Sequence, residues 1–321
     1  MTDKKKFLFI EPYYGISGDM FVASLIALGA GTKEFFDAIN NFDTEGKYSI
    51  SVENVNRAGI EAKLFKVILN DTANNKEKDH HSNGKTLEEI EKIINGNNKL
   101  PADVKKKSFN LFKKLAEAEK KVHFKKEKVH FHEVGAIDSI IDICAAIFAL
   151  DILKIEKIYT TSVNIGYGTV KTDHGMIPIP SPAASELLKN IPVFVNEELP
   201  EFEFTTPTGA LIISQLCDFR KEMKYEFLFE KTAYGAGSHN FTLFPNILRA
   251  SICSSIEKKK ILHEKNTEDV YVIESIFDDA TGEEMAFLKE SILNAGALDC
   301  IILPASGKKT DRLILFPLFA Q

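Results

Sequence analysis

The spacing of hydrophobic residues divides the chain into strand-like and helix-like segments. Phe7–Ile10 is a short apolar run, and Tyr48–Val55 and Ile60–Leu69 alternate on either side of a turn at Gly59, which predicts a hairpin. Residues 101–122 carry apolar side chains at helical spacing, which predicts an amphipathic helix. Residues 136–150 are nearly all apolar, so the helix predicted there should be central and buried.

Capping residues mark where several helices begin. Ser17 is a suitable N-cap for a helix that runs to about Leu28. Thr86 and Glu89 have the spacing of a capping box, and Thr206 followed by Pro207 predicts another helix start. The polar residues 70–85 lack periodicity and are interpreted as a loop.

The last fifth of the chain has a different pattern. After a charged segment, a strand (270–276), a helix (281–295) and two strands (298–303 and 312–319) are predicted. A split-βαβ domain of ferredoxin type would need one more helix and strand. We therefore expect an α+β protein: a large mixed α/β N-terminal domain (1–254), a linker (255–267), and an incomplete split-βαβ C-terminal domain (268–321).

Composition narrows the classes of protein. The net charge of −6 argues against a general nucleic-acid binder. No apolar run approaches the ~20 residues of a membrane span, and the apolar run after the N-terminal lysines is too short for a secretory signal. The four cysteines are far apart and form no CxxC pair, so we expect free thiols and a cytoplasmic location. From the charge and the short apolar runs we expect neither nucleic acid nor membrane as a partner.

The first candidate site is the segment Gly15–Met20, GISGDM. Its two glycines would lie in a strand-to-helix turn, where backbone N–H groups at the helix start can bind an anion. The plain alternative is that Ser17 caps the helix and Asp19 interacts favourably with its dipole, and the residues alone favour that alternative.

The second candidate is His130, His132 and Glu133, followed by Asp138 and Asp142. On a strand the two histidines face the same side, and imidazoles with a carboxylate suit nickel, zinc or cobalt. Asp138 and Asp142 lie one helical turn apart and could add oxygen ligands or orient the histidines. Half-buried strand histidines are the alternative, but acids in so apolar a helix favour a function.

Three weaker candidates remain. His80 and His81 lie in the polar loop, where they could bind nickel transiently or simply be solvated. His174 and the threonine-rich run 205–209 could equally contact phosphate or form turns and caps. Asp278 and Asp279 could hold manganese or magnesium with a nucleotide, or cap the next helix, while Lys308 and Lys309 could neutralise phosphates or be solvated.

Several blocks in this order resemble the nickel-insertion protein family. They are Gly15–Met20, Leu115–Val122, Val129–Ile143 (VHFHEVGAIDSIIDI), His174–Pro182, Thr206–Ala210, Tyr234–Gly237, Pro245–Arg249 and Ala295–Asp299. The resemblance covers almost the whole chain, and the block at 129–143 is long and highly specific.

The resemblance implies a cyclometallase that makes a nickel pincer cofactor. CTP with Mn(II) or Mg(II) would bind the C-terminal domain through Asp278, Asp279, Lys308 and Lys309. Ni(II) would enter pyridinium-3,5-bisthiocarboxylate mononucleotide, and CMP and diphosphate would leave. Further implications are a client apoenzyme of lactate racemase type and a homo-oligomer. The nickel candidates are His130, His132 and Glu133, with His80 and His81, and the catalytic candidates are Asp19 and Asp138.

The chain departs from the family pattern in places. Glu11–Tyr14 replaces the usual DCFS before GISGDM, and residues 274–281 (ESIFDDAT) replace ETNIDDMT. Members continue past the position of Gln321, so the resemblance implies a short product, a truncated copy or a degenerate one. Two rivals therefore stay open: a nickel chaperone without catalysis, and a nucleotide-dependent enzyme that uses no nickel.

Overall fold

The computed structural model describes residues 6–44, 48–69, 85–122, 137–172, 175–219, 226–256, 271–277, 279–306 and 312–320. The chain forms two compact units, Met1–Glu257 and Lys258–Gln321, and each is described by itself. In the described residues no helix is long and apolar enough to cross a membrane.

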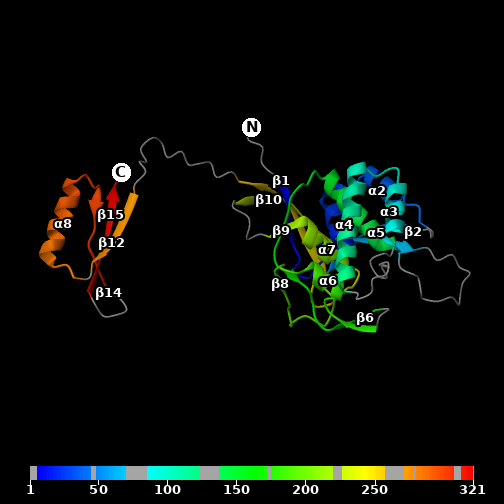
Figure 1. Ribbon diagram of the computed structural model, residues 1–321. Helices are drawn as coiled ribbons and strands as arrows, with labels where there is room; N and C mark the ends of the chain where they lie inside the picture. Colours follow the sequence, from blue (N-terminus) through cyan, green and yellow to red (C-terminus); the bar gives the residue numbers. More distant parts are fainter. Residues whose placement is uncertain are drawn as a thin grey trace, which may run out of the picture. The chain divides into compact units, whose positions relative to one another are not determined.

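The first unit is built on a mixed seven-stranded sheet (Figure 1). Its strand order is β2-β3-β10-β11-β1-β4-β9. The strands are β1 (Lys6–Glu11), β2 (Tyr48–Arg57), β3 (Ile60–Leu69), β4 (Ile158–Thr160), β9 (Cys217–Phe219), β10 (Phe227–Ala236) and β11 (Ile247–Ser255). β1 pairs antiparallel with β11 and parallel with β4, and the β3–β10 and β4–β9 pairs are also parallel.

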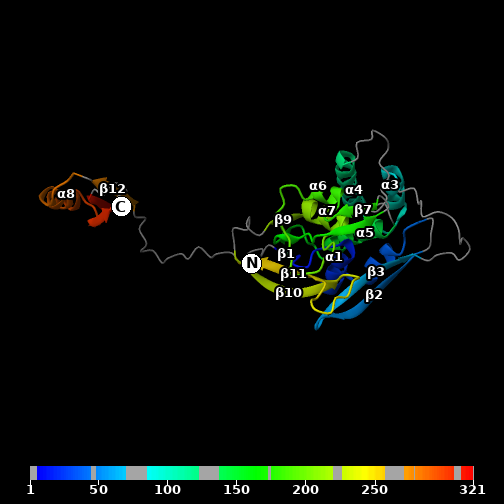
Figure 2. The same cartoon turned by 90° about the horizontal axis from the view of Figure 1, so that it is seen from below.

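The helices of this unit gather on one side of the sheet (Figure 2). They are α1 (Gly18–Leu25), α2 (Lys33–Ile39), α3 (Leu87–Gly96), α4 (Ala102–Val122), α5 (Ile137–Ile152), α6 (Pro182–Leu187) and α7 (Pro207–Leu216). A π-helical turn, η1 (Ile26–Ala30), follows α1 directly. The helical backbone is interrupted at Gly29, whose φ of 122° is one that glycine adopts readily. Two short ladders, β5 (Val163–Asn164) with β8 (Val193–Phe194) and β6 (Thr169–Thr172) with β7 (Gly175–Pro178), complete the unit.

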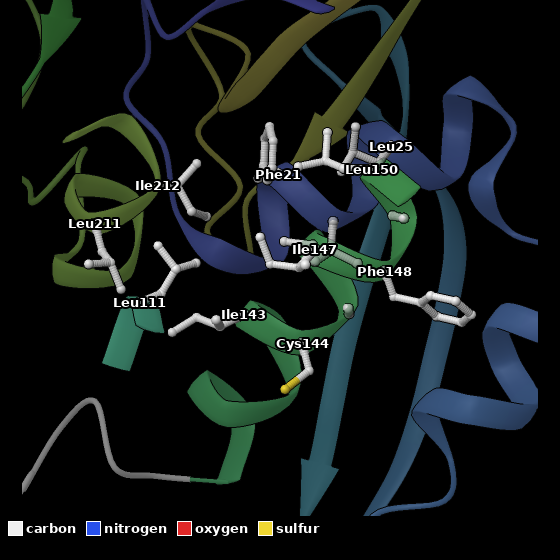
Figure 3. Packing of buried hydrophobic residues seen from close by; sticks show 14 of the residues in the cluster. Phe21, Leu25, Leu111, Ile143, Cys144, Ile147, Phe148, Leu150, Leu211 and Ile212 are labelled. Atoms are coloured by element: carbon white, nitrogen blue, oxygen red, sulfur yellow. The ribbon is translucent and has the colours of Figure 1, made fainter. Parts of the chain in front are cut away.

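Helix α5 is the centre of the core, which confirms the prediction from its apolar sequence. Ten of its residues are buried, among them Ile143, Ile147 and Phe148. Figure 3 shows Ile143 directed toward Leu111 of α4 and Ile147 toward Phe21 of α1. Phe148 points to the opposite side of α5, where its ring stacks on Phe35 of α2 at 6.1 Å between centroids. Burial of such side chains contributes roughly 1.5–3 kcal/mol each, so the ten buried residues of α5 make a large contribution to the stability of this core.

The four cysteines are free, and three of them, Cys144, Cys253 and Cys300, are buried. Burial raises the pKa of the Cys144 thiol to about 12 and that of Cys253 to about 12. Burial also raises the pKa values of Cys217 and Cys300. All four sulfur atoms are therefore held as thiols at neutral pH.

The predicted hairpin, the amphipathic helix and the helix starts at Thr86 and Thr206 are confirmed. Other predictions were wrong in detail. The apolar run 158–165 predicts a single strand, but in the structure it divides, because β4 enters the large sheet while β5 pairs with β8. The glycine-rich stretch 166–175 contains strand β6. Strand β10 includes the first three residues of the Tyr234–Gly237 block.

The capping box of α3 gives a simple stability prediction. Thr86 Oγ1 accepts a hydrogen bond from the Glu89 amide at 3.3 Å, and the Glu89 carboxylate accepts one from the Thr86 amide at 2.7 Å. Thr86→Ala should lower the free energy of unfolding by about 1 kcal/mol, measured by urea denaturation. Thr86→Ser keeps the hydroxyl and should change little, so an equal loss in both variants would contradict the capping role.

The second unit is a small antiparallel sheet with one helix. Its elements are β12 (Tyr271–Phe277), α8 (Gly282–Asn294), β13 (Asp299–Cys300), β14 (Leu303–Ser306) and β15 (Arg312–Ala320). β15 lies between β12 and β13 and also pairs with β14, which occupies part of the stretch 304–311 between the two strands predicted from the sequence. Thr281 and Glu284 form a capping box for α8.

Candidate functional site

The loops that precede α1 and α7 are joined to each other, so the two helices begin side by side. The Ile16 amide donates to Phe204 O at 3.0 Å, and the Thr206 amide donates to Ile16 O at 3.2 Å. Gly15 has φ 75°, and a Cβ atom there would overlap the carbonyl of Phe204. The GISGDM glycine is therefore required by this close approach of two backbones.

A cavity of about 580 Å³ opens where these helices begin. Helix α1 contributes Asp19, α5 contributes Asp138 and Asp142, and the start of α7 contributes Thr206 and Thr208. The remaining lining residues are Ser17, Gly18, Phe65, Lys66, Val67, Ile68, Ser139, Glu203, Pro207 and Ser238. The cavity thus brings carboxylates from two helices and from Glu203 together with hydroxyl groups from four segments of the chain.

Asp19 is held by a set of hydrogen bonds. Its Oδ1 accepts from the Ser17 hydroxyl and from the Met20 amide at 2.9 Å, and its Oδ2 accepts from Ser238 Oγ at 3.2 Å. Burial raises the pKa of Asp19, and these hydrogen bonds oppose that rise. Ser17 is the N-cap residue of α1, as predicted, but its side chain makes no capping bond, because its hydroxyl donates to Asp19 instead.

Asp142 lies against the first residue of α1. A Cβ on Gly18 would come within 2.6 Å of Asp142 Oδ2, so only glycine leaves room for this carboxylate. Burial raises the pKa of Asp142 well above its usual range, and the nearby Asp19 and Asp138 carboxylates raise it further. Asp138 is exposed at the cavity edge, one turn before Asp142 on α5.

A second cavity of about 370 Å³ shares Ser17, Asp19, Glu203, Thr206 and Ser238 with the first. Its other walls are Met20, Phe202, Phe204, Gly237, His239 and Asn246. The Phe202 and His239 rings lie 5.3 Å apart between centroids, at 42°. The two cavities together form one site with an acidic part and an aromatic part.

The structure brings together only some of the residues that the sequence suggested. Asp19 and Asp138 line the same cavity, with the Thr206–Thr208 segment beside them. His80, His81, His130, His132, Glu133, His174, Asp278, Lys308 and Lys309 lie outside the described residues. Within the described ranges, no group of three or more His, Cys, Asp or Glu residues is placed to hold a metal ion.

Asp279 is described in the second unit. It is exposed and lines a cavity of about 580 Å³ with Phe277, Glu283 and Glu284. Glu284 is engaged in capping α8, which was the plain alternative for the acids of this segment.

Sequence reasoning missed four residues of the site: Phe202, Glu203, Ser238 and His239. Ser238 and His239 directly follow the Tyr234–Gly237 block, which could have indicated them. Phe202 and Glu203 stand in a stretch of alternating acids and phenylalanines without a motif, and nothing in their local sequence indicates a site.

Fold and site together define a mixed α/β protein with an acidic cavity at converging helix starts. The nickel insertion protein family model matches residues 8–314, and the chain belongs to this family. The pyridinium-3,5-bisthiocarboxylic acid mononucleotide nickel insertion proteins of Clostridium acetobutylicum and Clostridium kluyveri are each 37% identical to it over 95% of the chain. A putative nickel insertion protein of Dictyoglomus thermophilum is 35% identical over 98% of the chain.

The chain spans about three quarters of the length of these relatives: 76%, 74% and 76% in the order given. No solved structure is significantly similar to it. Family membership implies nickel handling and indicates a metal-insertion activity.

Proposed function

We propose that the protein inserts Ni(II) into pyridinium-3,5-bisthiocarboxylic acid mononucleotide, with CTP cleaved to CMP and diphosphate. The observation that carries the proposal is the family match over residues 8–314, together with relatives named for this substrate. The acidic cavity supports it, because insertion needs a group that accepts a proton.

The proton follows from the chemistry of a nickel–carbon bond. A pincer complex forms when nickel binds the two thiocarboxylate sulfurs and replaces the hydrogen on the ring carbon between them. The C–H bond breaks, its electron pair forms the Ni–C bond, and the proton passes to a base. Asp142 would take this role: it lines the cavity beside Gly18, and burial raises its pKa, which makes the deprotonated carboxylate a stronger base than an exposed one. Asp19 and Asp138 would bind and orient the reacting groups beside it.

Nickel, as the inserted substrate, would be delivered by His130, His132 and Glu133, with His80 and His81 as a transient first contact. Imidazole suits nickel and releases it to softer sulfur ligands. We place this step in residues 1–254, joined by the segment 255–267 to the nucleotide-binding residues 268–321.

The second unit would bind CTP. The strand order β12-β15-β13, with the last strand between the other two, is the order of the first three strands of a split-βαβ domain and supports that interpretation. Carboxylates such as Asp279, with Asp278, suit Mn(II) or Mg(II), which would neutralise phosphate charge. Lys308 and Lys309 would contact the phosphates. The completed cofactor would pass in the cytoplasm to an apoenzyme of lactate racemase type, and we propose a homo-oligomer.

A reconstituted insertion reaction tests the proposal. The purified chain would be mixed with the apo precursor, Ni(II), Mn(II) and CTP, and CMP release would be followed with activation of a lactate racemase apoenzyme. Both signals are expected, and both should depend on CTP. Stoichiometric nickel binding without CMP release or activation would instead identify a nickel chaperone. Nucleotide cleavage that is indifferent to nickel would identify an enzyme of another kind.

A further inference from the structure

The smaller cavity has a composition that the nickel chemistry does not explain. Three aromatic rings, Phe202, Phe204 and His239, line it together with the carboxylates of Asp19 and Glu203. Among the described residues that line it there is no lysine or arginine. Aromatic faces together with carboxylates attract a flat cation and disfavour a phosphate.

The aromatic wall is braced from behind. His239 lies 4.3 Å from Phe241 between ring centroids, Phe241 stacks on Phe244 at 4.3 Å, and Phe244 stacks on Tyr14 at 5.4 Å. The Phe202 ring meets Phe241 edge-on at 5.2 Å. His239 is exposed, but its contacts with the Phe241 and Phe202 rings fix the orientation of the imidazole plane.

The backbone that carries His239 is fixed as well. The buried Asn246 side chain donates to His239 O at 3.0 Å, and the Gly237 amide donates to Asn246 O at 3.0 Å. A Cβ at Gly237 would overlap the Asn246 amide, so the loop closes tightly at its base. The aromatic wall is therefore formed before any ligand arrives, which lowers the entropic cost of binding.

We propose that the smaller cavity binds the positively charged pyridinium ring of the mononucleotide, with Phe202 and His239 as the ring faces that select it. This inference rests on the proposed function and adds the place of the ring. The cavity volume of about 370 Å³ is within the usual range for a small-molecule site. Since Asp19 lines both cavities, a ring bound here lies at the boundary with the Asp142 carboxylate cavity.

The hydroxyl groups of the shared wall suit the rest of the ligand. The Thr206 hydroxyl accepts from the Gly209 amide and can donate its own hydrogen to an anionic arm of the ring. The Ser17 and Ser238 hydroxyls donate to Asp19 and hold that carboxylate beside the ring. The arms are ligands of the incoming nickel ion in the proposed reaction, so part of their charge is neutralised by the metal.

Binding of a redox pair of analogues tests the role of ring charge. The probes are pyridinium-3,5-dicarboxylic acid mononucleotide, the all-oxygen analogue of the precursor, and its 1,4-dihydro form, which has nearly the same shape but an uncharged ring. Isothermal titration calorimetry with the full chain should show the pyridinium form binding about tenfold more tightly, a typical effect of a desolvated cation–π contact.

Variants assign the effect to the two rings. Phe202→Leu and His239→Leu should each remove most of the preference, while His239→Phe, which keeps a ring face, should retain it. Phe229→Leu is the matched control, because Phe229 is an exposed phenylalanine of β10 that packs against Phe227 and Phe9 instead. Equal binding of the two probes, binding of neither, or an unchanged preference in both leucine variants would overturn the proposal.

The outcome is separable from that of the insertion reaction. A chain that inserts nickel but binds both probes equally retains the proposed function and loses this subsite. A chain that prefers the pyridinium form but inserts no nickel retains the subsite and loses the function.

Discussion

Asp142→Asn should stabilise the protein at neutral pH while lowering nickel insertion by about a hundredfold or more, the usual range for loss of a general base. Burial and the neighbouring Asp19 and Asp138 carboxylates raise the pKa of Asp142, so the folded protein disfavours the charged carboxylate. An asparagine fills the same space without that charge. A functional carboxylate that lowers stability is the expected trade-off at an active site.

The sign of the pH dependence follows from the same shift. The pKa of Asp142 is higher in the folded than in the unfolded chain. The contribution of the protonated Asp142 to the free energy of unfolding is therefore present in full below the unfolded pKa and is lost as pH rises through the folded pKa. The gain from Asp142→Asn should therefore be present at pH 7.5 and shrink at acidic pH. Each ~1 kcal/mol of gain corresponds to about 2–4 °C in Tm.

Asp151→Asn is the matched control for this prediction. Asp151 lies on the same helix, is exposed, and is 3.8 Å from Lys154 Nζ. It should leave activity unchanged and stability within about 0.5 kcal/mol. Differential scanning calorimetry at two pH values and the insertion reaction provide the measurements. An Asp142→Asn protein with wild-type activity would exclude Asp142 as the base.

Gly209→Ala should cost roughly 3 kcal/mol or more of unfolding free energy, at the upper end of what overpacking costs. A Cβ at Gly209, in the first turn of α7, would overlap the carbonyl oxygen of Ile16, which is backbone and cannot rotate away. The same carbonyl accepts the hydrogen bond from the Thr206 amide. The substitution would therefore separate the two loops that form the site.

Gly96→Ala tests whether that loss is specific. Gly96 is the last residue of α3, and a Cβ there would meet no atom within 4 Å. Alanine at such a position usually stabilises by about 0.4–1 kcal/mol through the unfolded chain. Urea denaturation of both variants should give opposite signs. A loss below about 1 kcal/mol for Gly209→Ala would mean that the helix starts are not tightly coupled.

The elements that the sequence predicted well are those with strong local signals. Helix α5 could be predicted because its sequence is almost entirely apolar, and ten of its residues are buried. Helix α3 could be predicted because Thr86 and Glu89 form their capping box within one turn. Strand β4 was joined to β5 in the prediction because both are apolar, and only the pairing partners divide them. Such partners lie far away along the chain, so local periodicity does not contain them.

The site shows the same limit more sharply. Asp19 could be proposed because it stands in a glycine-flanked turn, and Asp138 because it interrupts an apolar helix. Ser238 reaches Asp19 from a position 219 residues later in the chain, and the Phe202 and His239 rings meet only through the fold. Contacts of this kind depend on the sheet order, which no motif in either segment specifies.

The protonated state of the cysteines has a consequence for the traffic of a thiophilic metal. The form of cysteine that captures a metal ion or reacts with an oxidant is the thiolate, and burial suppresses that form at Cys144, Cys217, Cys253 and Cys300. A nickel ion that passes through the protein therefore meets no competing sulfur donor among the cysteines of the chain. In the proposed reaction the thiocarboxylates of the precursor would then be the strongest sulfur ligands that the nickel ion meets, so the protein would pass nickel on without retaining it.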